Sequence, residues 1–283
     1  MGRFETRDAL QAHLHSIRVQ GQSIGLVPTM GNLHEGHLAL VEAARNDSDY
    51  VLATIFVNPL QFGPAEDLDS YPRTLEEDCS QLEAHHCDAV FIPSAEEMYP
   101  GGLDNQALVT VPGLSERHCG ASRPLHFSGV CTVVCKLFNL TNPDIAFFGE
   151  KDYQQLQVIR KMTQDLCIPV SITGVPTARL PSGLALSSRN NYLDPSQLET
   201  AAILQATLKE AAGKLEQGNQ EFKRIEDSAK TRLTESCFQP DYFSICHAST
   251  LEPATTGDKS LVILAAAWLG QTRLIDNIII TLR

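Results

Sequence analysis

Basic residues, tryptophan and cysteine are all scarce in this chain. It has one tryptophan and eight cysteines in 283 residues, and its 22 lysines and arginines are outnumbered by 34 aspartates and glutamates. The net charge of −12 is opposite in sign to that of proteins that bind nucleic acid by displacing phosphate counterions. We therefore expect neither a nucleic acid nor an anionic membrane surface as a partner.

Long apolar runs are also missing. The longest, Leu261 to Leu269, is far short of the ~20 residues that a membrane-spanning helix needs. The first sixteen residues carry charges and histidines where a signal peptide has its apolar region. Nothing in this pattern indicates export, so we expect a cytoplasmic protein.

The cysteines are scattered, and no two form a Cys-x-x-Cys pair. Cys131 and Cys135 stand four residues apart and would share one face of a helix. Two interpretations remain open for this pair: buried thiols that act as small apolar side chains, or a metal or redox pair. The spacing of the cysteines as a whole is typical of a protein from a reducing compartment.

Residues 1–176 alternate between helical and strand-like patterns. Strands are predicted at 23–27, 50–57, 88–92 and 144–148, the first ending at Pro28, and helices at 10–17, 38–44, 74–86, 127–140 and 152–166. Thr74 with Glu77 three residues later predicts a capping box at the start of the third helix. Strands that alternate with helices predict a parallel sheet built from right-handed crossovers.

After residue 176 the pattern changes. A segment rich in serine, glycine and proline, 177–190, precedes two predicted helices at 196–217 and 220–235. Strands are then predicted at 242–247, 261–268 and 273–282. We expect an α/β domain over 1–176 and a smaller α+β domain over 177–283, with 177–190 as the hinge.

Polar segments follow three of the predicted strands. They are TMGNLHEGH at 29–37, NPLQF at 58–62 and GEKDYQQ at 149–155. Ligands of parallel α/β sheets bind at the carboxyl ends of the strands. The three segments are therefore expected to converge on one site.

His34 and His37 stand three apart at a predicted helix start, with Gly36 between them removing a side chain. A helix N-terminus offers N–H donors and partial positive charge, which suits a phosphate group. A metal pair is the alternative, but the zinc-protease pattern has its histidines four apart. A purely structural pair is the other alternative.

A lysine and a hydroxyl-rich loop could serve the same anion. Lys151 could neutralise a polyphosphate, or be a surface lysine at a helix start. Ser187, Ser188 and Arg189 offer several donors to phosphate oxygens on a hinge able to close, or form a turn that caps a helix.

Two glutamines complete the candidate site. Gln61 follows a strand, and Gln155 stands four residues after Lys151, on the same face if one helix contains both. Their amides donate and accept, which suits a hydroxylated substrate, although any one glutamine could simply be solvated.

These segments carry a resemblance to a known family. The strings VPTMGNLHEGH (27–37), FVNPLQF (56–62), YPRTLEEDC (71–79), FFGEKDYQQL (147–156) and GLALSSRN (183–190) resemble, in order, signature segments of the pantoate–β-alanine ligase (pantothenate synthetase) family. HEGH is similar to the HIGH-type motif of the wider nucleotidylyltransferase superfamily, and SSR to the counterpart of its KMSKS loop.

The resemblance implies a Rossmann-like N-terminal domain that binds ATP and pantoate, a smaller C-terminal lid domain and a homodimer. It implies a ligase that condenses (R)-pantoate with β-alanine through a pantoyl adenylate, converting ATP to AMP and pyrophosphate. Magnesium would be held mostly by the nucleotide phosphates.

It also assigns site residues. His34, His37, Lys151 and Arg189 would be catalytic, with His37 the proton donor. Gln61 and Gln155 would bind pantoate, Gln61 also β-alanine, and Ala178 would meet the adenine through its backbone. The implied ATP-binding residues are Met30, Gly31, Asn32, Leu33, His34, Glu35, Gly36, His37, Gly149, Glu150, Lys151, Asp152, Ala178, Leu186, Ser187, Ser188 and Arg189.

One segment departs from the family pattern. Residues 123–127 read RPLHF where the family has RPGHF, so Leu125 replaces a glycine and would be strained if its φ is positive. Two other functions stay open from the residues alone: a nucleotidyltransferase that transfers AMP or CMP to a phosphorylated acceptor, and a non-catalytic nucleotide-binding protein.

Overall fold

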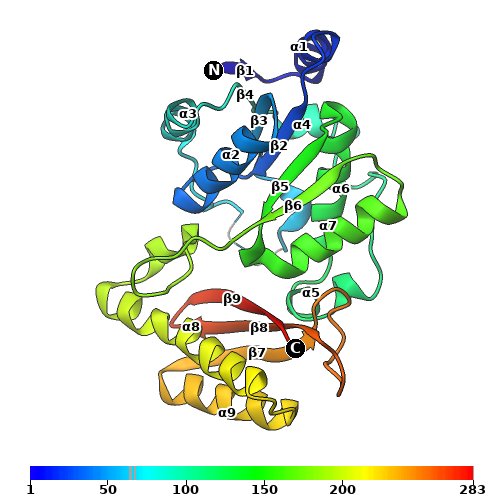
Figure 1. Cartoon of the computed structure of the whole chain (residues 1–283). Coiled ribbons are helices and arrows are strands. Elements are labelled where there is room, and N and C mark those ends of the chain that lie inside the picture. The colour runs from blue at the N-terminus through cyan, green and yellow to red at the C-terminus, as the bar shows by residue number, and fades with distance from the viewer. Residues whose placement is uncertain (64–65, 67, 283) are drawn as a thin grey trace. The chain divides into compact units, whose positions relative to one another are not determined.

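The computed structural model describes residues 1–63, 66 and 68–282 (Figure 1). Contacts within the chain divide it into two compact units. The first consists of Met1–Glu150 and Gln155–Pro176, and the second of Lys151–Gln154 and the chain from Thr177 on. Each unit has its own sheet.

The first unit is built on a parallel sheet of six strands in the order β1-β4-β3-β2-β5-β6. The strands are β1 (Gly2–Phe4), β2 (Ile24–Thr29), β3 (Tyr50–Ile55), β4 (Ala89–Phe91), β5 (Ile145–Gly149) and β6 (Ser171–Val175). Its α-helices are α1 (Arg7–Val19), α2 (Glu35–Asp47), α3 (Leu75–Ala84), α4 (Ala95–Met98), α5 (Cys119–Ser122), α6 (His126–Thr141) and α7 (Tyr153–Asp165). The predicted Rossmann-like parallel sheet is confirmed.

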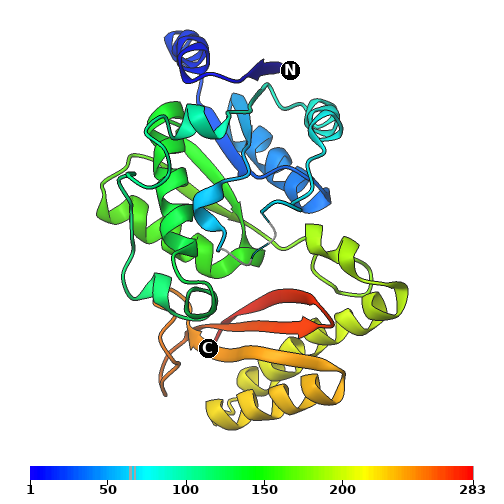
Figure 2. The same cartoon turned by 180° about the vertical axis from the view of Figure 1, so that it is seen from behind.

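Helices cover both faces of this sheet (Figures 1 and 2). On one face, Val41 of α2 and Leu82 of α3 pack against Val27 and Val51 of the strands. On the other, Phe138 of α6 lies edge-on to Phe148 of β5, with ring centroids 6.5 Å apart. Because both faces are buried, the strands are nearly continuous runs of apolar residues.

Two sequence-based expectations about the first unit are wrong in detail. The strand was expected to end at Pro28, but Pro28 lies inside β2. Proline is tolerated there because β5 pairs with β2 only over Gly25 and Leu26, so on the β5 side of Pro28 no backbone N–H is needed. The Thr74 side chain does not cap α3. Its ψ of 45° lies outside the extended region that is typical of a capping residue, and its hydroxyl donates to Asp78 Oδ1 at 3.2 Å.

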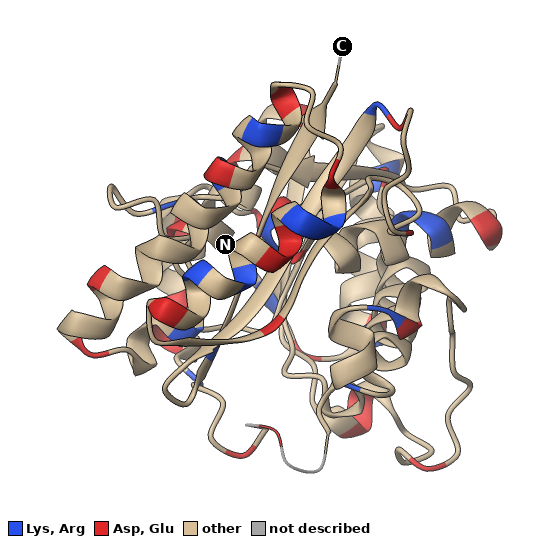
Figure 3. Cartoon of the chain, turned by 90° about the horizontal axis from the view of Figure 1, so that it is seen from below, with Lys and Arg blue, Asp and Glu red and all other residues tan. Residues whose placement is uncertain are grey.

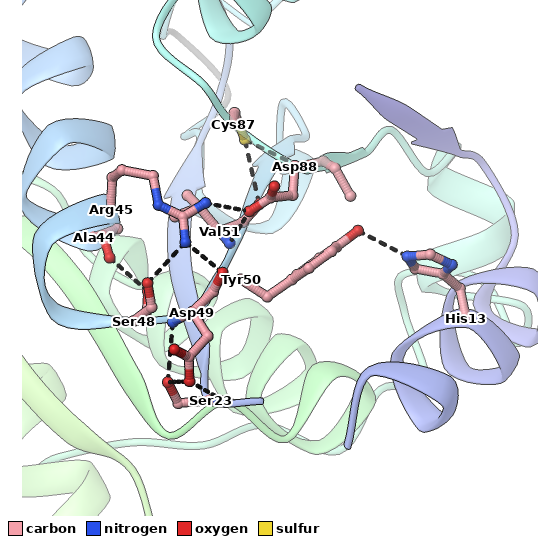
Figure 4. Close-up of polar contacts among 11 residues, drawn as sticks. His13, Ser23, Ala44, Arg45, Ser48, Asp49, Tyr50, Val51, Cys87 and Asp88 are labelled. Atoms are coloured by element: carbon pink, nitrogen blue, oxygen red, sulfur yellow. Dashed lines mark hydrogen bonds and ion pairs between the residues drawn. The ribbon is translucent and has the colours of Figure 1, made fainter. Parts of the chain in front are cut away.

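Side-chain bonds tie together the amino-terminal edge of the sheet (Figure 4). Arg45 Nη1 donates to Asp88 Oδ2 (2.6 Å), and the same oxygen accepts from the Val51 N–H (2.7 Å). Ser23 donates to Asp49 through both its N–H and its hydroxyl, and these bonds lower the pKa of the Asp49 carboxyl. This edge therefore fixes the strand starts and leaves the opposite edge for ligands.

The second unit carries an antiparallel sheet in the order β7-β8-β9. Its strands are β7 (Phe238–His247), β8 (Ser260–Leu269) and β9 (Thr272–Thr281), and its α-helices are α8 (Pro195–Glu216) and α9 (Phe222–Glu235). The two helices and one face of the sheet enclose a core that includes Leu208, Leu233 and Ile263. Helices followed by strands give the predicted α+β arrangement.

Basic and acidic positions are interspersed along the helices in Figure 3. Several helices carry ion pairs four residues apart: Lys161–Asp165, Lys214–Glu210 and Lys223–Asp227. None of the helices in the described part of the chain is long and apolar enough to cross a membrane.

Leu125 adopts the left-handed conformation that the family glycine suggested, with φ 68° and ψ −9°, just before α6. Its side chain is 75% exposed, so it gains little packing in return. A left-handed non-glycine residue costs roughly 1–2 kcal/mol. Leucine is therefore strained here, as expected.

Leu125→Gly is expected to stabilise the protein by about 0.5–1 kcal/mol, because glycine removes the strain but costs more unfolded-state entropy. Thermal melting checks this. Leu125→Ala is the matched control: it keeps the Cβ atom and the strain, so it should not raise the melting temperature. An equal rise in both variants would show that loss of the exposed side chain, and not relief of strain, is responsible.

Candidate active site

Segments that follow the strands of the first sheet gather at its carboxyl edge. Residues 30–37 follow β2, residues 58–61 follow β3, and Gly149 ends β5. All these strands are parallel, so their carboxyl ends lie on one edge. The predicted convergence of the first two segments is seen directly, because Gln61 Nε2 lies 3.0 Å from Met30 Sδ.

His34 and His37 each accept a backbone N–H at the first turn of α2. The Gly36 N–H donates to His34 Nδ1 (3.1 Å) and the His34 N–H to His37 Nδ1 (3.3 Å), which forms a capping box. The two ring centroids are 4.1 Å apart. A backbone N–H always donates, so each Nδ1 accepts and each neutral ring carries its proton on Nε2.

The histidine pair thus changes the expected anion site. Two N–H groups of the helix start, which the sequence suggested would receive an anion directly, are used by the imidazoles. In their place the pair supplies two Nε2–H donors, a group that hydrogen-bonds a phosphate oxygen well.

Asp78, which sequence reasoning missed, holds the loop before the histidines. Its carboxylate is 1% exposed and accepts from the Asn32 N–H (2.9 Å) and the Leu33 N–H (2.8 Å). Gly31 has φ 83°, and a Cβ there would lie 3.0 Å from Asp78 Oδ2, so only glycine lets the loop approach this closely. The carboxylate and the glycine together set the path of the loop from β2 to α2.

Asn58, also missed, orients Gln61. It is 1% exposed; its Nδ2 donates to Gln61 Oε1 (3.1 Å) and its Oδ1 accepts from the Tyr99 hydroxyl (2.7 Å). A Cβ on Gly129 of α6 would lie 2.3 Å from the carbonyl oxygen of Leu60, so the 3₁₀ turn Pro59–Gln61 packs directly on the helix backbone. The signal was an asparagine before a proline in a polar segment.

A second chain of contacts reaches the backbone of Gln61. Arg123 Nε donates to Glu66 Oε1 (2.8 Å), and Arg123 Nη1 lies 3.1 Å from His126 Nε2. Since a guanidinium only donates, His126 Nε2 accepts, and its Nδ1–H donates to the Gln61 carbonyl at 2.8 Å. The RPLHF segment therefore positions Gln61, a candidate substrate-binding residue.

The Glu66–Arg123 pair gives a pH dependence of stability. Burial raises the pKa of Glu66, but the bonds and charge of Arg123 outweigh it and the net pKa lies below 4.5. The pair therefore stabilises the fold above that pH, and its contribution is lost as the pH falls through the folded pKa. Glu66→Gln should melt below the wild type at pH 7, and the difference should shrink on acidification. A pH-independent difference would contradict this.

Lys151 lies in a 3₁₀ turn, Glu150–Asp152, which precedes α7. Its ammonium is 3.9 Å from Asp152 Oδ2, and its side chain is 19% exposed. Gln155 lies within α7. In place of the one continuous helix that was expected, a 3₁₀ turn ends at Asp152 and α7 begins at Tyr153.

In the second unit, residues 178–186 form a short hairpin. The Leu186 N–H donates to the Ala178 carbonyl (2.9 Å), and Arg179 forms a bridge with Ala185. The Ser187 hydroxyl accepts from the Arg189 N–H (3.3 Å) at the start of the 3₁₀ helix Ser188–Tyr192. The Ser187 hydroxyl therefore caps a helix, which was the structural alternative, and keeps its own O–H to donate.

Cys131 and Cys135 lie on α6, and burial raises the pKa of both thiols, that of Cys131 to about 12. Such thiols are inert at neutral pH. No group of three or more His, Cys, Asp or Glu side chains in the described ranges could hold a metal ion.

A parallel sheet with helices on both faces, and with glycine, paired histidines and amides beyond its carboxyl edge, defines a nucleotide-binding protein of the Rossmann-like class. The family model that matches residues 3–279 is Pantoate-beta-alanine ligase. The chain belongs to the pantoate–β-alanine ligase family, whose members are ligases that form an amide bond.

Individual relatives agree over nearly the full length. A pantothenate synthetase of Hahella chejuensis is 55% identical over 269 residues, 95% of each chain, and one of Idiomarina loihiensis is 56% identical over 270 residues, 95% of this chain and 96% of its own. The crystal structure of pantothenate synthetase from Thermus thermophilus superposes with a TM-score of 0.91 at 44% identity, covering 98% of this chain and 99% of its own. A Francisella tularensis ligase complexed with beta-gamma ATP and beta-alanine gives 0.83 at 33%, covering 98% and 97%.

Proposed function

We propose that this protein condenses (R)-pantoate with β-alanine, using ATP, to give pantothenate, AMP and pyrophosphate through a pantoyl adenylate. The carrying observation is the His34–His37 pair, which presents two Nε2–H donors at the carboxyl edge of the sheet in a chain of this family. The solved relative that holds beta-gamma ATP and beta-alanine supports the same substrates here.

The first step joins pantoate to the nucleotide. A pantoate carboxylate oxygen attacks the α-phosphorus of ATP, and the bond from that phosphorus to the bridging oxygen breaks as pyrophosphate leaves. Negative charge grows on the phosphate oxygens, where His34, His37 and the ammonium of Lys151 would donate. Removing one such preorganised donor typically costs about 2.7–4 kcal/mol of transition-state stabilisation.

The second step forms the amide. The neutral amine of β-alanine attacks the carbonyl carbon of the adenylate, the carbon–oxygen bond to AMP breaks, and the proton that the amine nitrogen loses passes to water. Gln61, held by Asn58 from one side and by His126 from the other, would bind the carboxylate and hydroxyl groups of the substrates. Holding both reactants in place could lower the barrier by roughly 7–11 kcal/mol. Both histidines are neutral hydrogen-bond donors in this scheme, and His37, the candidate proton donor, would transfer a proton only as an imidazolium.

The remaining site assignments form part of the proposal. Residues 1–176 would be the catalytic domain and 177–283 the lid domain. Asn32 Nδ2 is buried and has no hydrogen-bond partner among the described residues, and a ligand acceptor would satisfy it. The remaining ATP contacts would come from Met30, Gly31, Leu33, Glu35, Gly36, Gly149, Glu150, Asp152, Ala178, Leu186, Ser187, Ser188 and Arg189, and Gln155 would bind pantoate.

The proposal also covers the setting of the reaction. Magnesium would arrive on the phosphates of ATP, neutralising charge there, and no protein cage is assigned to it. The family resemblance supports a homodimer. The cysteine spacing and the net charge of −12 support a cytoplasmic protein with small-molecule substrates and no nucleic-acid or membrane partner.

Arg189→Lys tests whether the loop recognises phosphate through a planar fork. Lysine keeps the charge but cannot form two parallel bonds to one phosphate. We expect KM for ATP to rise about tenfold with unchanged melting, for a loss of about 1.4 kcal/mol. Steady-state kinetics at varied ATP check this, and activity equal to wild type would refute bidentate recognition.

Pyrophosphate release tests the proposed function. With ATP, magnesium and (R)-pantoate, sustained release should require β-alanine and should accompany AMP and pantothenate. A stable nucleotidylated product would instead indicate a nucleotidyltransferase. ATP binding without release under any combination would indicate a non-catalytic protein.

A further inference from the structure

Two consecutive polar residues interrupt the apolar pattern of β9. Leu274, Ile278 and Ile280 alternate along the strand on the side of α8 and α9, and Asp276 occupies the position between the first two. Asn277 stands between Ile275 and Ile279 in the row that faces the other way. Both rows are thus broken at the same point.

Asp276 holds the hairpin that contains Ala178. Its carboxylate accepts two bonds from Arg179, Nη1 to Oδ2 at 2.7 Å and Nη2 to Oδ1 at 2.8 Å, and its side chain is 2% exposed. Arg179 Nη1 also donates to the Gly183 carbonyl (3.1 Å), across the hairpin. The guanidinium therefore joins both arms of the hairpin to β9.

Asn277 holds the segment around Lys151, which is also assigned to ATP in the proposed function. Its Nδ2 donates to the Lys151 carbonyl oxygen at 3.0 Å, and the side chain is almost fully buried. Its own N–H donates to Asp276 Oδ1 at 2.8 Å, so the two anchors are also bonded to each other. One short piece of strand is thus fastened to Lys151 and to the 178–186 hairpin.

A contribution to folding stability does not by itself explain why Asp276 and Asn277 are polar. A buried ion pair costs desolvation that its attraction barely repays, and an apolar pair of similar volume is often as stable. The isoleucine and leucine rows on either side show that this strand position could be apolar. A fixed geometry, in contrast, requires directional bonds of this kind.

We propose that Asp276 and Asn277 are positioning residues that set the distance between Lys151 and the loop Leu186–Arg189. The inference rests on the proposed function, since both segments are assigned there to ATP. The strand itself makes no contact with the reacting groups in this proposal. It acts through Lys151 by the Asn277 bond and through the hairpin by the Asp276–Arg179 pair.

A double-mutant cycle tests the role of the Asn277–Lys151 bond. Asn277→Ala should slow pyrophosphate release in a single turnover with ATP and pantoate by about 10- to 100-fold, the scale of an ångström-size displacement of a catalytic group. In a Lys151→Ala background the same change should cost less than about twofold. Equal losses in both backgrounds would overturn the positioning role.

Asn277→Leu guards against a folding defect. Leucine branches at the same carbon as asparagine and continues the isoleucine row, so this variant should melt at or above the wild-type temperature while losing the bond to Lys151. It should show the same background-dependent loss of rate. An Asn277→Leu protein that is folded and fully active would overturn the proposal.

Arg179→Lys tests the role of the Asp276–Arg179 pair in the same way, in the wild-type and in an Arg189→Ala background. It keeps the charge and loses the paired bonds, so KM for ATP should rise in the wild-type background only. Asp241→Asn is the matched control, because it breaks the Arg273–Asp241 ion pair (2.7 Å) on the same sheet and should leave both rate and KM unchanged. The wild-type activity distinguishes failure of the proposed function from failure of the positioning role. If the wild type does not turn over, the proposed function is wrong. If it does, but each substitution costs the same in both backgrounds, only the positioning role is wrong.

Discussion

Lys151→Ala is expected to lower the rate of adenylate formation by about 10²–10³-fold, the usual effect of removing one preorganised donor from developing negative charge. The melting temperature should change little, because the lysine's ion pair with Asp152 is long, at 3.9 Å. The backbone bond from Asn277 to the Lys151 carbonyl survives the substitution. Single-turnover pyrophosphate release with ATP and pantoate measures the rate.

Lys161→Ala is the matched control. Lys161 pairs with Asp165 at the far end of α7, and its side chain is about half exposed. Such surface pairs contribute about 0.2–1 kcal/mol, so this variant should keep wild-type activity. A collapse of melting in Lys151→Ala would make Lys151 a structural residue and contradict its catalytic assignment.

Asp78→Asn is expected to impair both folding stability and activity. Asparagine keeps one acceptor oxygen but turns an NH₂ group toward either the Asn32 or the Leu33 N–H, leaving a buried donor unsatisfied. The cost is about 1–3 kcal/mol, or roughly 3–10 °C in melting temperature. Because the loop before His34 is then displaced, adenylate formation should fall by at least about tenfold.

Glu77→Gln distinguishes this effect from a general loss of charge on α3. Glu77 is the neighbouring acidic residue, exposed in the first turn. Its substitution should change stability by less than about 0.5 kcal/mol and leave activity intact. If both variants behave alike, Asp78 does not position the histidine loop.

Most of the first sheet could be predicted from the sequence, because its buried strands are runs of apolar residues between helical patterns. The strands that were missed are the edge strands of the sheet. β1 has only three residues, and β6 (Ser171–Val175) contains serine, threonine and glycine and is mostly half-buried. An edge strand packs on fewer neighbours, so its sequence carries less of the apolar signal.

The candidate site was predicted less completely than the fold. The histidines and Gln61 stood out because they follow predicted strands, and the 186–189 loop because it lies in the predicted hinge. Asn58, Asp78 and Asp276 did not stand out. Asn58 bonds to Gln61 three residues on, but its other partner, Tyr99, is distant in the chain. Asp78 and Asp276 act through distant partners, such as Arg179 for Asp276. Hydrogen-bond partners at that separation are fixed by the tertiary fold and leave no local spacing to detect.

At Leu125, in contrast, the sequence did point to a feature of the local backbone. The substitution of leucine for the glycine of RPGHF raised the question of a positive φ at this one residue, and the structure has φ 68° there. The sequence could not reveal that the adjoining Arg123 and His126 connect Glu66 to the Gln61 carbonyl. That connection links the departure from the family pattern to a residue assigned to the substrate.

The attack of the pantoate carboxylate on the α-phosphorus is the central claim, and an isotope label tests it most directly. (R)-Pantoate carrying ¹⁸O in its carboxylate is incubated with ATP, magnesium, β-alanine and the wild-type protein, and the products are analysed by mass spectrometry. One ¹⁸O atom is expected in AMP for each pantothenate formed, because that oxygen bridges the adenylate and leaves with AMP. Label in inorganic phosphate or pyrophosphate, with none in AMP, would contradict an adenylate mechanism.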